Sequence, residues 1–108
     1  MTNAETFFKD LSEKIKDVKP GKMFGSLCIK TPNGKSAAMI WKDHLVVKLD
    51  GNPMQEALNL RGSQRFQPME GHLMKEWVQI PFIHKDRWKE FILLSIKSVS
   101  SLPQKSKA

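Results

Sequence analysis

Apolar side chains recur at helical spacing in three segments of the chain, residues 3–18, 53–61 and 86–98. In the first segment, lysine and aspartate side chains occupy the opposite face, as expected for a helix that packs on one side against a core. The last segment carries Asp86 near its start and Lys97 near its end, the arrangement that the helix dipole favours. The pattern therefore predicts three amphipathic helices.

Residues with known terminal preferences bound the first two helices. Thr2 or Asn3 is placed to cap the first helix, and Pro20-Gly21 is placed to end it. Asn52 is placed to cap the second helix, with Pro53 at the first helical position, where its missing N–H costs nothing.

Short apolar runs between the helices predict five strands, residues 22–30, 36–41, 44–49, 64–68 and 73–80. The first three follow one another closely enough to form an antiparallel meander. The fourth is expected to be an edge strand, because it contains a proline.

The resulting order is helix, three strands, helix, two strands, helix (α-β-β-β-α-β-β-α). Helices grouped around an antiparallel sheet predict a two-layer α+β domain. We expect residues 1–99 to form this single domain and residues 100–108, which are small, polar and basic, to form a flexible tail.

The turn at Thr31-Pro32-Asn33-Gly34 connects the first two predicted strands. An Asn-Gly pair favours a two-residue hairpin loop, but Pro32 would then stand where the ladder needs a backbone donor. A type I turn with Pro32 and Asn33 central and Gly34 in the left-handed conformation suits all four residues better.

The strands are apolar on both sides. Leu45, Val47 and Leu49 share one face of their strand, which leaves Val46 on the other face, and Cys28 also belongs to a second apolar face. With helices covering only one face, part of this surface is expected to be exposed unless a tail or a second copy covers it. Homodimerisation through the sheet or its edge is therefore one hypothesis.

Length and composition indicate one globular domain. The chain has 108 residues, 40% of them hydrophobic and 27% charged, which is an ordinary balance for a folded domain. The lone cysteine, Cys28, fits a reducing compartment, and neither a signal peptide nor a membrane-length apolar run is visible. We expect a cytoplasmic protein without a membrane role.

The charge balance raises the question of nucleic-acid binding. The chain has eighteen lysine and arginine residues and eleven acidic residues, which gives a formal net charge of +7. Such an excess favours contact with phosphates, but the lysines are scattered from Lys9 to Lys107.

The residue types that carry catalysis or bind metals are not grouped. His44, His72 and His84 lie far apart in the sequence, and Cys28 has no partner cysteine and lies within a strand. The glycines occur singly, so no phosphate-binding loop precedes a helix. We therefore expect no metal, no cofactor, no small-molecule ligand and no enzyme activity.

Two short segments are candidates for binding. Met23-Phe24-Gly25 is compatible with a contact surface, although the alternative is that Gly25 serves the backbone geometry of the strand. Trp77 lies between Lys75 and Gln79 on one strand face, where an aromatic ring could stack on a base or a partner side chain.

Several short motifs in the right order resemble the TfoX N-terminal domain family, the front half of bacterial competence regulators also called Sxy. The matching segments are Lys22-Met23-Phe24-Gly25, Asn33-Gly34, Leu45 to Lys48, the region of Phe66, and Gly71 to Val78 closed by Pro81. The resemblance implies the fold described above, related to that of secretion chaperones, and a regulatory or interaction role. The chain departs from the family at Ser26, where a second glycine is usual. It also corresponds only to the front half of the two-domain regulators, so their role in DNA uptake is not carried over.

These observations favour a non-catalytic regulatory or protein-interaction domain, with a protein partner or a second copy of itself as ligand. The alternative is a nucleic-acid-associated regulator that binds phosphates through its scattered lysines. The candidate binding residues are Lys22, Met23, Phe24, Gly25, Lys48, Lys75 and Trp77.

Overall fold

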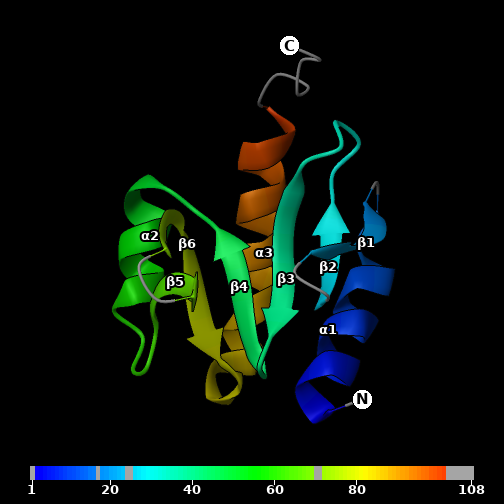
Figure 1. Cartoon of the computed structure of the whole chain (residues 1–108). Helices are drawn as coiled ribbons and strands as arrows, with labels where there is room; N and C mark the ends of the chain where they lie inside the picture. Colours follow the sequence, from blue (N-terminus) through cyan, green and yellow to red (C-terminus); the bar gives the residue numbers. More distant parts are fainter. Residues whose placement is uncertain (1, 17, 24–25, 70–71, 102–108) are drawn as a thin grey trace.

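The computed structural model describes residues 2–16, 18–23, 26–69 and 72–101 (Figure 1). Within these residues it is an α+β domain in which three helices accompany an antiparallel sheet, as predicted, but the sheet has six strands and not five. In chain order the elements are α1 (Asn3–Lys14), β1 (Lys19–Met23), β2 (Ser26–Lys30), β3 (Ser36–Trp41), β4 (His44–Lys48), α2 (Gly51–Leu58), β5 (Gln64–Met69), β6 (His72–Pro81), the short 3-10 helix η1 (Phe82–His84) and α3 (Lys85–Ser100).

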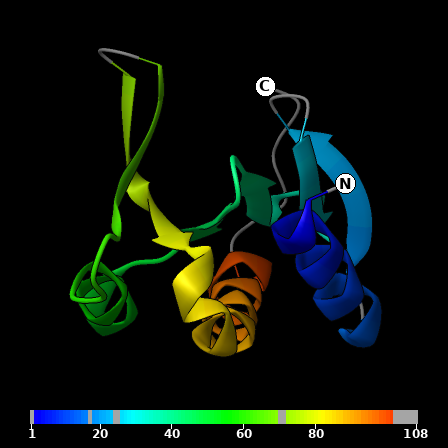
Figure 2. The ribbon, with the colours of Figure 1, turned by 90° about the horizontal axis from the view of Figure 1, so that it is seen from below.

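The strands are ordered β1-β2-β3-β4-β6-β5, so β1 and β5 form the two edges of the sheet. Figure 2 shows the three helices together on one side of the sheet. The β1–β2 hairpin, in blue and cyan, and the β5–β6 hairpin, in green and yellow, rise on the other side, at opposite ends of the sheet. The domain is therefore two-layered, with strongly curved sheet ends.

The segment predicted as one strand, residues 22–30, contains parts of two strands. β1 and β2 pair antiparallel, with Lys22 opposite Leu27 and Met23 opposite Ser26. The prediction was wrong here because the apolar run continues through both strands and does not mark where the chain reverses. Phe24 and Gly25 lie outside the described residues.

The first helix is shorter than predicted. α1 ends at Lys14, and Ile15 already has an extended backbone, with φ −99° and ψ 130°. Ile15 and Val18 are apolar because they pack against the same core, although they lie outside the helix. Pro20-Gly21 does not end the helix but belongs to β1.

The second helix begins two residues earlier than predicted, at Gly51. Asp50, not Asn52, occupies the N-cap position, and its side chain makes no capping hydrogen bond. Gly51 adopts a left-handed φ of 57°, which sets the direction of the chain as it enters α2.

The main core lies between the sheet and the helices. Its fully buried large side chains include Phe8 of α1, Ile29 and Leu45 of the sheet, and Trp88 and Phe91 of α3. The Trp88 Nε1–H donates a hydrogen bond of 3.2 Å to the carbonyl oxygen of Pro81, which satisfies the indole donor inside the core.

A second buried cluster lies on the opposite face of the sheet. It consists of Cys28, Met39, Val46, Phe66 and Trp77, with Trp41 packed against it. The expectation that Cys28 and Val46 belong to an exposed face is therefore wrong, since they are 2% and 0% exposed. The apolar character of both strand faces is explained by burial within one chain.

The turn at residues 31–34 has the predicted form. The Gly34 N–H donates to the Thr31 carbonyl oxygen at 2.9 Å, and Gly34 has a left-handed φ of 81°. The Asn33 side-chain amide also donates to the Val99 carbonyl oxygen at 2.9 Å. The turn thus satisfies a carbonyl at the end of α3, where helix carbonyls lack partners within the helix.

None of the helices in the described part of the chain is long and apolar enough to cross a membrane.

Candidate functional site

The predicted binding residues are not brought together in one place. Lys22 is exposed on the edge strand β1, whereas Lys48 and Trp77 are paired across β4 and β6, with β2 and β3 lying between. Phe24 and Gly25, and the side chains of Met23 and Lys75, lie outside the described part of the structure.

Trp77 is not placed to stack on a ligand. Its side chain belongs to the second buried cluster and is only 9% exposed, so the prediction of an exposed aromatic platform is wrong. Lys48 beside it forms an ion pair with Glu76, with 3.7 Å between Nζ and Oε1. Both side chains therefore make contacts within the domain: Trp77 packs in the second cluster and Lys48 pairs with Glu76.

The histidines with described side chains bond to nearby backbone. A ring nitrogen of His44 lies 2.8 Å from the carbonyl oxygen of Lys42, and a ring nitrogen of His84 lies 2.8 Å from that of Arg61. The described residues contain no group of three histidine, cysteine or acidic side chains that could hold a metal ion.

The strongest charge network lies on the surface of α2 and α3. Arg87 hydrogen-bonds to Glu90, with 2.6 Å between Nε and Oε1, and also pairs with Glu56. The hydrogen bond to Glu90, followed by that to Glu56, raises the pKa of the Arg87 guanidinium further above its ordinary value. The same bond lowers the pKa of the Glu90 carboxyl. Through Arg87 and Glu56, the network links α3 to α2 by ion pairs.

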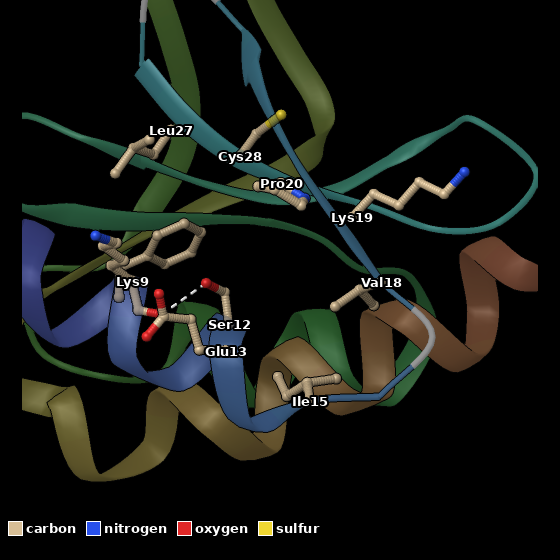
Figure 3. Close-up of a pocket in the computed structure, with 10 residues that line it drawn as sticks. Lys9, Ser12, Glu13, Ile15, Val18, Lys19, Pro20, Leu27 and Cys28 are labelled. Carbon is tan, nitrogen blue, oxygen red and sulfur yellow. Dashed lines mark hydrogen bonds between the residues drawn. The ribbon is translucent and has the colours of Figure 1, made fainter.

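A cavity of about 310 Å³ opens between the C-terminal half of α1 and the β1–β2 hairpin (Figure 3). We call it the α1–hairpin pocket. Its lining is mostly apolar, with polar groups from α1 and β1 at its margin. The lining residues are Phe8, Lys9, Ser12, Glu13, Ile15, Val18, Lys19, Pro20, Leu27 and Cys28.

The early end of α1 creates this pocket. Because the helix stops at Lys14 and Ile15 has an extended backbone, no further turn of α1 covers the hairpin at this point. Three apolar wall residues, Ile15, Val18 and Leu27, pack against the main core and yet remain only half buried. The pocket is thus a place where the edge of the main core remains open to solvent.

The reactive groups at the pocket are already engaged or turned away. The Ser12 hydroxyl donates to the Lys9 carbonyl oxygen within α1 at 2.7 Å. The Cys28 sulfur points away from Ser12 and Glu13 (Figure 3), into the second cluster, where it lies 3.9 Å from the Ser36 hydroxyl oxygen. What the lining presents to a ligand is therefore its shape and its apolar surface.

The chain around the pocket has an excess of basic residues. Residues 9–35 contain seven lysines and three acidic residues, so this quarter of the chain holds +4 of the formal +7. These residues form much of α1 and the β1–β2 hairpin, which lie together at one end of the molecule (Figure 1). The pocket lining itself holds Lys9, Lys19 and Glu13, and the elements that form it carry a net positive charge.

The sequence alone does not reveal this pocket. Ile15, Val18 and Leu27 have the spacing of core residues and contribute to the core, so nothing distinguishes a sealed wall from an open one. The one available signal is Pro20-Gly21, which ends the predicted helix and provides little side-chain volume beside it.

Comparison with protein-family models, with curated proteins and with solved structures finds no match to this chain.

Proposed function

We propose that this chain is a non-catalytic regulatory domain of the TfoX N-terminal type that binds a partner protein through the α1–hairpin pocket. The observation that supports this proposal is the combination of a mostly apolar cavity with a basic surround. A partner would place one apolar side chain in the cavity and acidic side chains around it.

The size of the pocket fits one or two apolar side chains. Its volume of about 310 Å³ is at the lower end of the range for ligand-binding cavities. A side chain that enters it would remove the exposed parts of Ile15, Val18 and Leu27 from water. Burial of one leucine side chain contributes about 1.5–3 kcal/mol, enough to make this contact the centre of an interface.

The surrounding charge favours an acidic partner. Lys9 and Lys14 belong to α1, Lys16 follows the helix and Lys19 begins β1, all close in sequence to the pocket wall. Attraction between this surface and an acidic partner would speed encounter and weaken with salt.

The same lysines favour a second candidate function, nucleic-acid binding. Phosphates would contact the lysines without entering the apolar cavity, and affinity would fall steeply with salt. The two functions therefore differ in whether the cavity is occupied.

An NMR titration separates them. The probes are the capped peptides Glu-Glu-Leu-Glu-Glu and Glu-Glu-Gly-Glu-Glu, followed by a single-stranded thymidine oligonucleotide. We expect the leucine peptide to shift the amide signals of Phe8, Val18 and Leu27, and the glycine peptide to leave them unchanged. Equal shifts from both peptides, or none, would contradict the proposal. Oligonucleotide binding that displaces the leucine peptide would favour the second function.

A further inference from the structure

β1 has a free outer edge beside the pocket. It pairs with β2 on one side, and within the described residues no strand pairs with its other side (Figure 1). Val18, Lys19 and Pro20, which lead into and begin this strand, also line the pocket. A ligand in the pocket therefore lies next to an unpaired strand edge.

The proline shows which backbone groups face outward. A proline in an edge strand places its nitrogen on the solvent side, because it has no N–H to give to the ladder. Pro20 is followed two residues later by Lys22, which has the same orientation in the strand. Lys22 therefore offers an N–H and a carbonyl outward, and Pro20 offers a carbonyl.

The two faces of β1 differ in chemistry. Pro20 and Lys22 lie opposite Ile29 and Leu27, whose side chains pack toward the main core, so this face is continuous with the pocket. Lys19 lies directly opposite Lys30 on the other face. A strand added to β1 would thus meet the apolar cavity and Lys22 on one face and the Lys19–Lys30 pair on the other.

The pairing of Lys19 with Lys30 is unfavourable in the free chain, because like charges directly opposite each other in a sheet repel. Among the described residues, no acidic side chain lies within 4 Å of either ammonium group. Gly21 leaves room for the Lys30 side chain, since a Cβ there would lie 3.0 Å from the Lys30 Cε. Acidic side chains on an added strand would relieve this repulsion.

Charge also decides between a second copy and an acidic partner. The edge strand β1 is basic, with Lys19 and Lys22. Edge pairing between two copies would bring like charges together, and lysine and proline on an edge are common devices against such pairing. An acidic strand is the complementary occupant.

We propose that the outer edge of β1 and the α1–hairpin pocket together bind an extended acidic segment of the partner as an added strand, with one apolar side chain in the pocket. This inference rests on the proposed function and specifies its partner. Strand addition of this kind takes affinity from backbone hydrogen bonds and specificity from pockets for alternate side chains.

The test uses the capped peptide Glu-Val-Glu-Leu-Glu-Val-Glu and two backbone N-methylated forms of it. One form is methylated at the valines and leucine, the other at the second and third glutamates. In an added strand only one set of amides faces β1, so we expect one form to bind at least roughly tenfold more weakly and the other within about threefold. Equal effects of both forms would overturn strand addition.

Two protein variants provide a second readout. Lys22→Pro removes the outward N–H, and we expect it to weaken peptide binding roughly fivefold relative to Lys22→Ala, which removes only the charge. The pocket-filling variant Ser12→Phe is expected to abolish binding. If Ser12→Phe abolishes binding but the N-methylated forms are equivalent, the strand is wrong and the pocket stands. If the peptide leaves the pocket signals unchanged, both proposals fail.

Discussion

Gly62 and Gly34 both adopt left-handed backbone conformations, with φ of 86° and 81°, but their surroundings differ. A Cβ at Gly62 would lie 3.0 Å from the Pro81 Cγ, a ring atom with little freedom to move. A Cβ at Gly34 would meet no atom within 4 Å. The two positions therefore separate backbone strain from steric contact.

We expect Gly34→Ala to lower the free energy of unfolding by about 1 kcal/mol, the cost of left-handed backbone for an L-residue. Gly62→Ala should lower it by about 2 kcal/mol or more, because the contact with Pro81 adds to the same strain. Urea unfolding of both variants checks this. Equal losses would show that Pro81 moves aside at no cost.

The Arg87–Glu90 pair gives a prediction on pH. Because the hydrogen bond from Arg87 lowers the pKa of Glu90 in the folded chain, this carboxylate stabilises the fold above its unfolded pKa of about 4.3. That contribution is lost as the pH falls through the lower folded pKa. It is small, because the Glu90 side chain is 47% exposed and solvent screens the pair.

Glu90→Gln should therefore lower stability at about pH 7 by less than about 1 kcal/mol. The difference from the native chain should shrink below about pH 4 and vanish near pH 2, where the native carboxyl is protonated as well. Urea unfolding at both pH values measures it. A difference that persists at the lower pH would show that Glu90 contributes through packing and not through its charge.

At the scale of elements, α1 positions one wall of the pocket and depends on its N-terminal cap. The Thr2 hydroxyl oxygen accepts a hydrogen bond of 3.2 Å from the Glu5 N–H, and the Glu5 carboxylate accepts one of 2.8 Å from the Thr2 N–H. This capping box satisfies two backbone donors at once.

Thr2→Ala should destabilise the chain by about 1 kcal/mol, because it removes the acceptor for the Glu5 N–H. Thr2→Ser keeps the hydroxyl and should leave stability nearly unchanged. Thermal or urea unfolding compares the two variants. A loss of similar size in both would indicate that the threonine methyl group, not the cap, stabilises α1.

The elements with distinct boundary signals are the ones that the sequence predicts best. β3 coincides with the predicted strand 36–41, and the turn before it has the predicted type because Pro32 excludes the alternative. The reversal between β1 and β2 could not be predicted, since Gly25 fits a bulge as well as a turn. The predicted site failed at Trp77 for a related reason, because an aromatic residue between polar neighbours in sequence can still be buried by another part of the chain.

At the scale of the whole molecule, the sheet has a core on each face. The helices bury one face, and the cluster of Cys28, Met39, Val46, Phe66 and Trp77 is buried on the other. The exposed sheet face that motivated homodimerisation is therefore not present at these residues. The β1 edge is basic, so it too disfavours pairing between copies.

The pocket lies in a part of the molecule that has an excess of positive charge. The end formed by α1 and the hairpin combines an apolar cavity with excess lysine, and the proposed function depends on both. A partner that used the lysines alone would leave the cavity empty. Occupancy of the cavity is therefore the central claim.

The measurement that tests this claim most directly is the affinity of the capped Glu-Glu-Leu-Glu-Glu peptide for Ser12→Phe and Ser12→Ala, compared with the native chain by NMR titration. Ser12 lines the pocket, and its hydroxyl bonds only within α1, so both variants are expected to fold. We predict that Ser12→Phe, which fills the cavity, binds at least roughly tenfold more weakly, as expected for loss of one buried leucine contact. Ser12→Ala should bind like the native chain. Equal affinities for the two variants would contradict the pocket as the binding site.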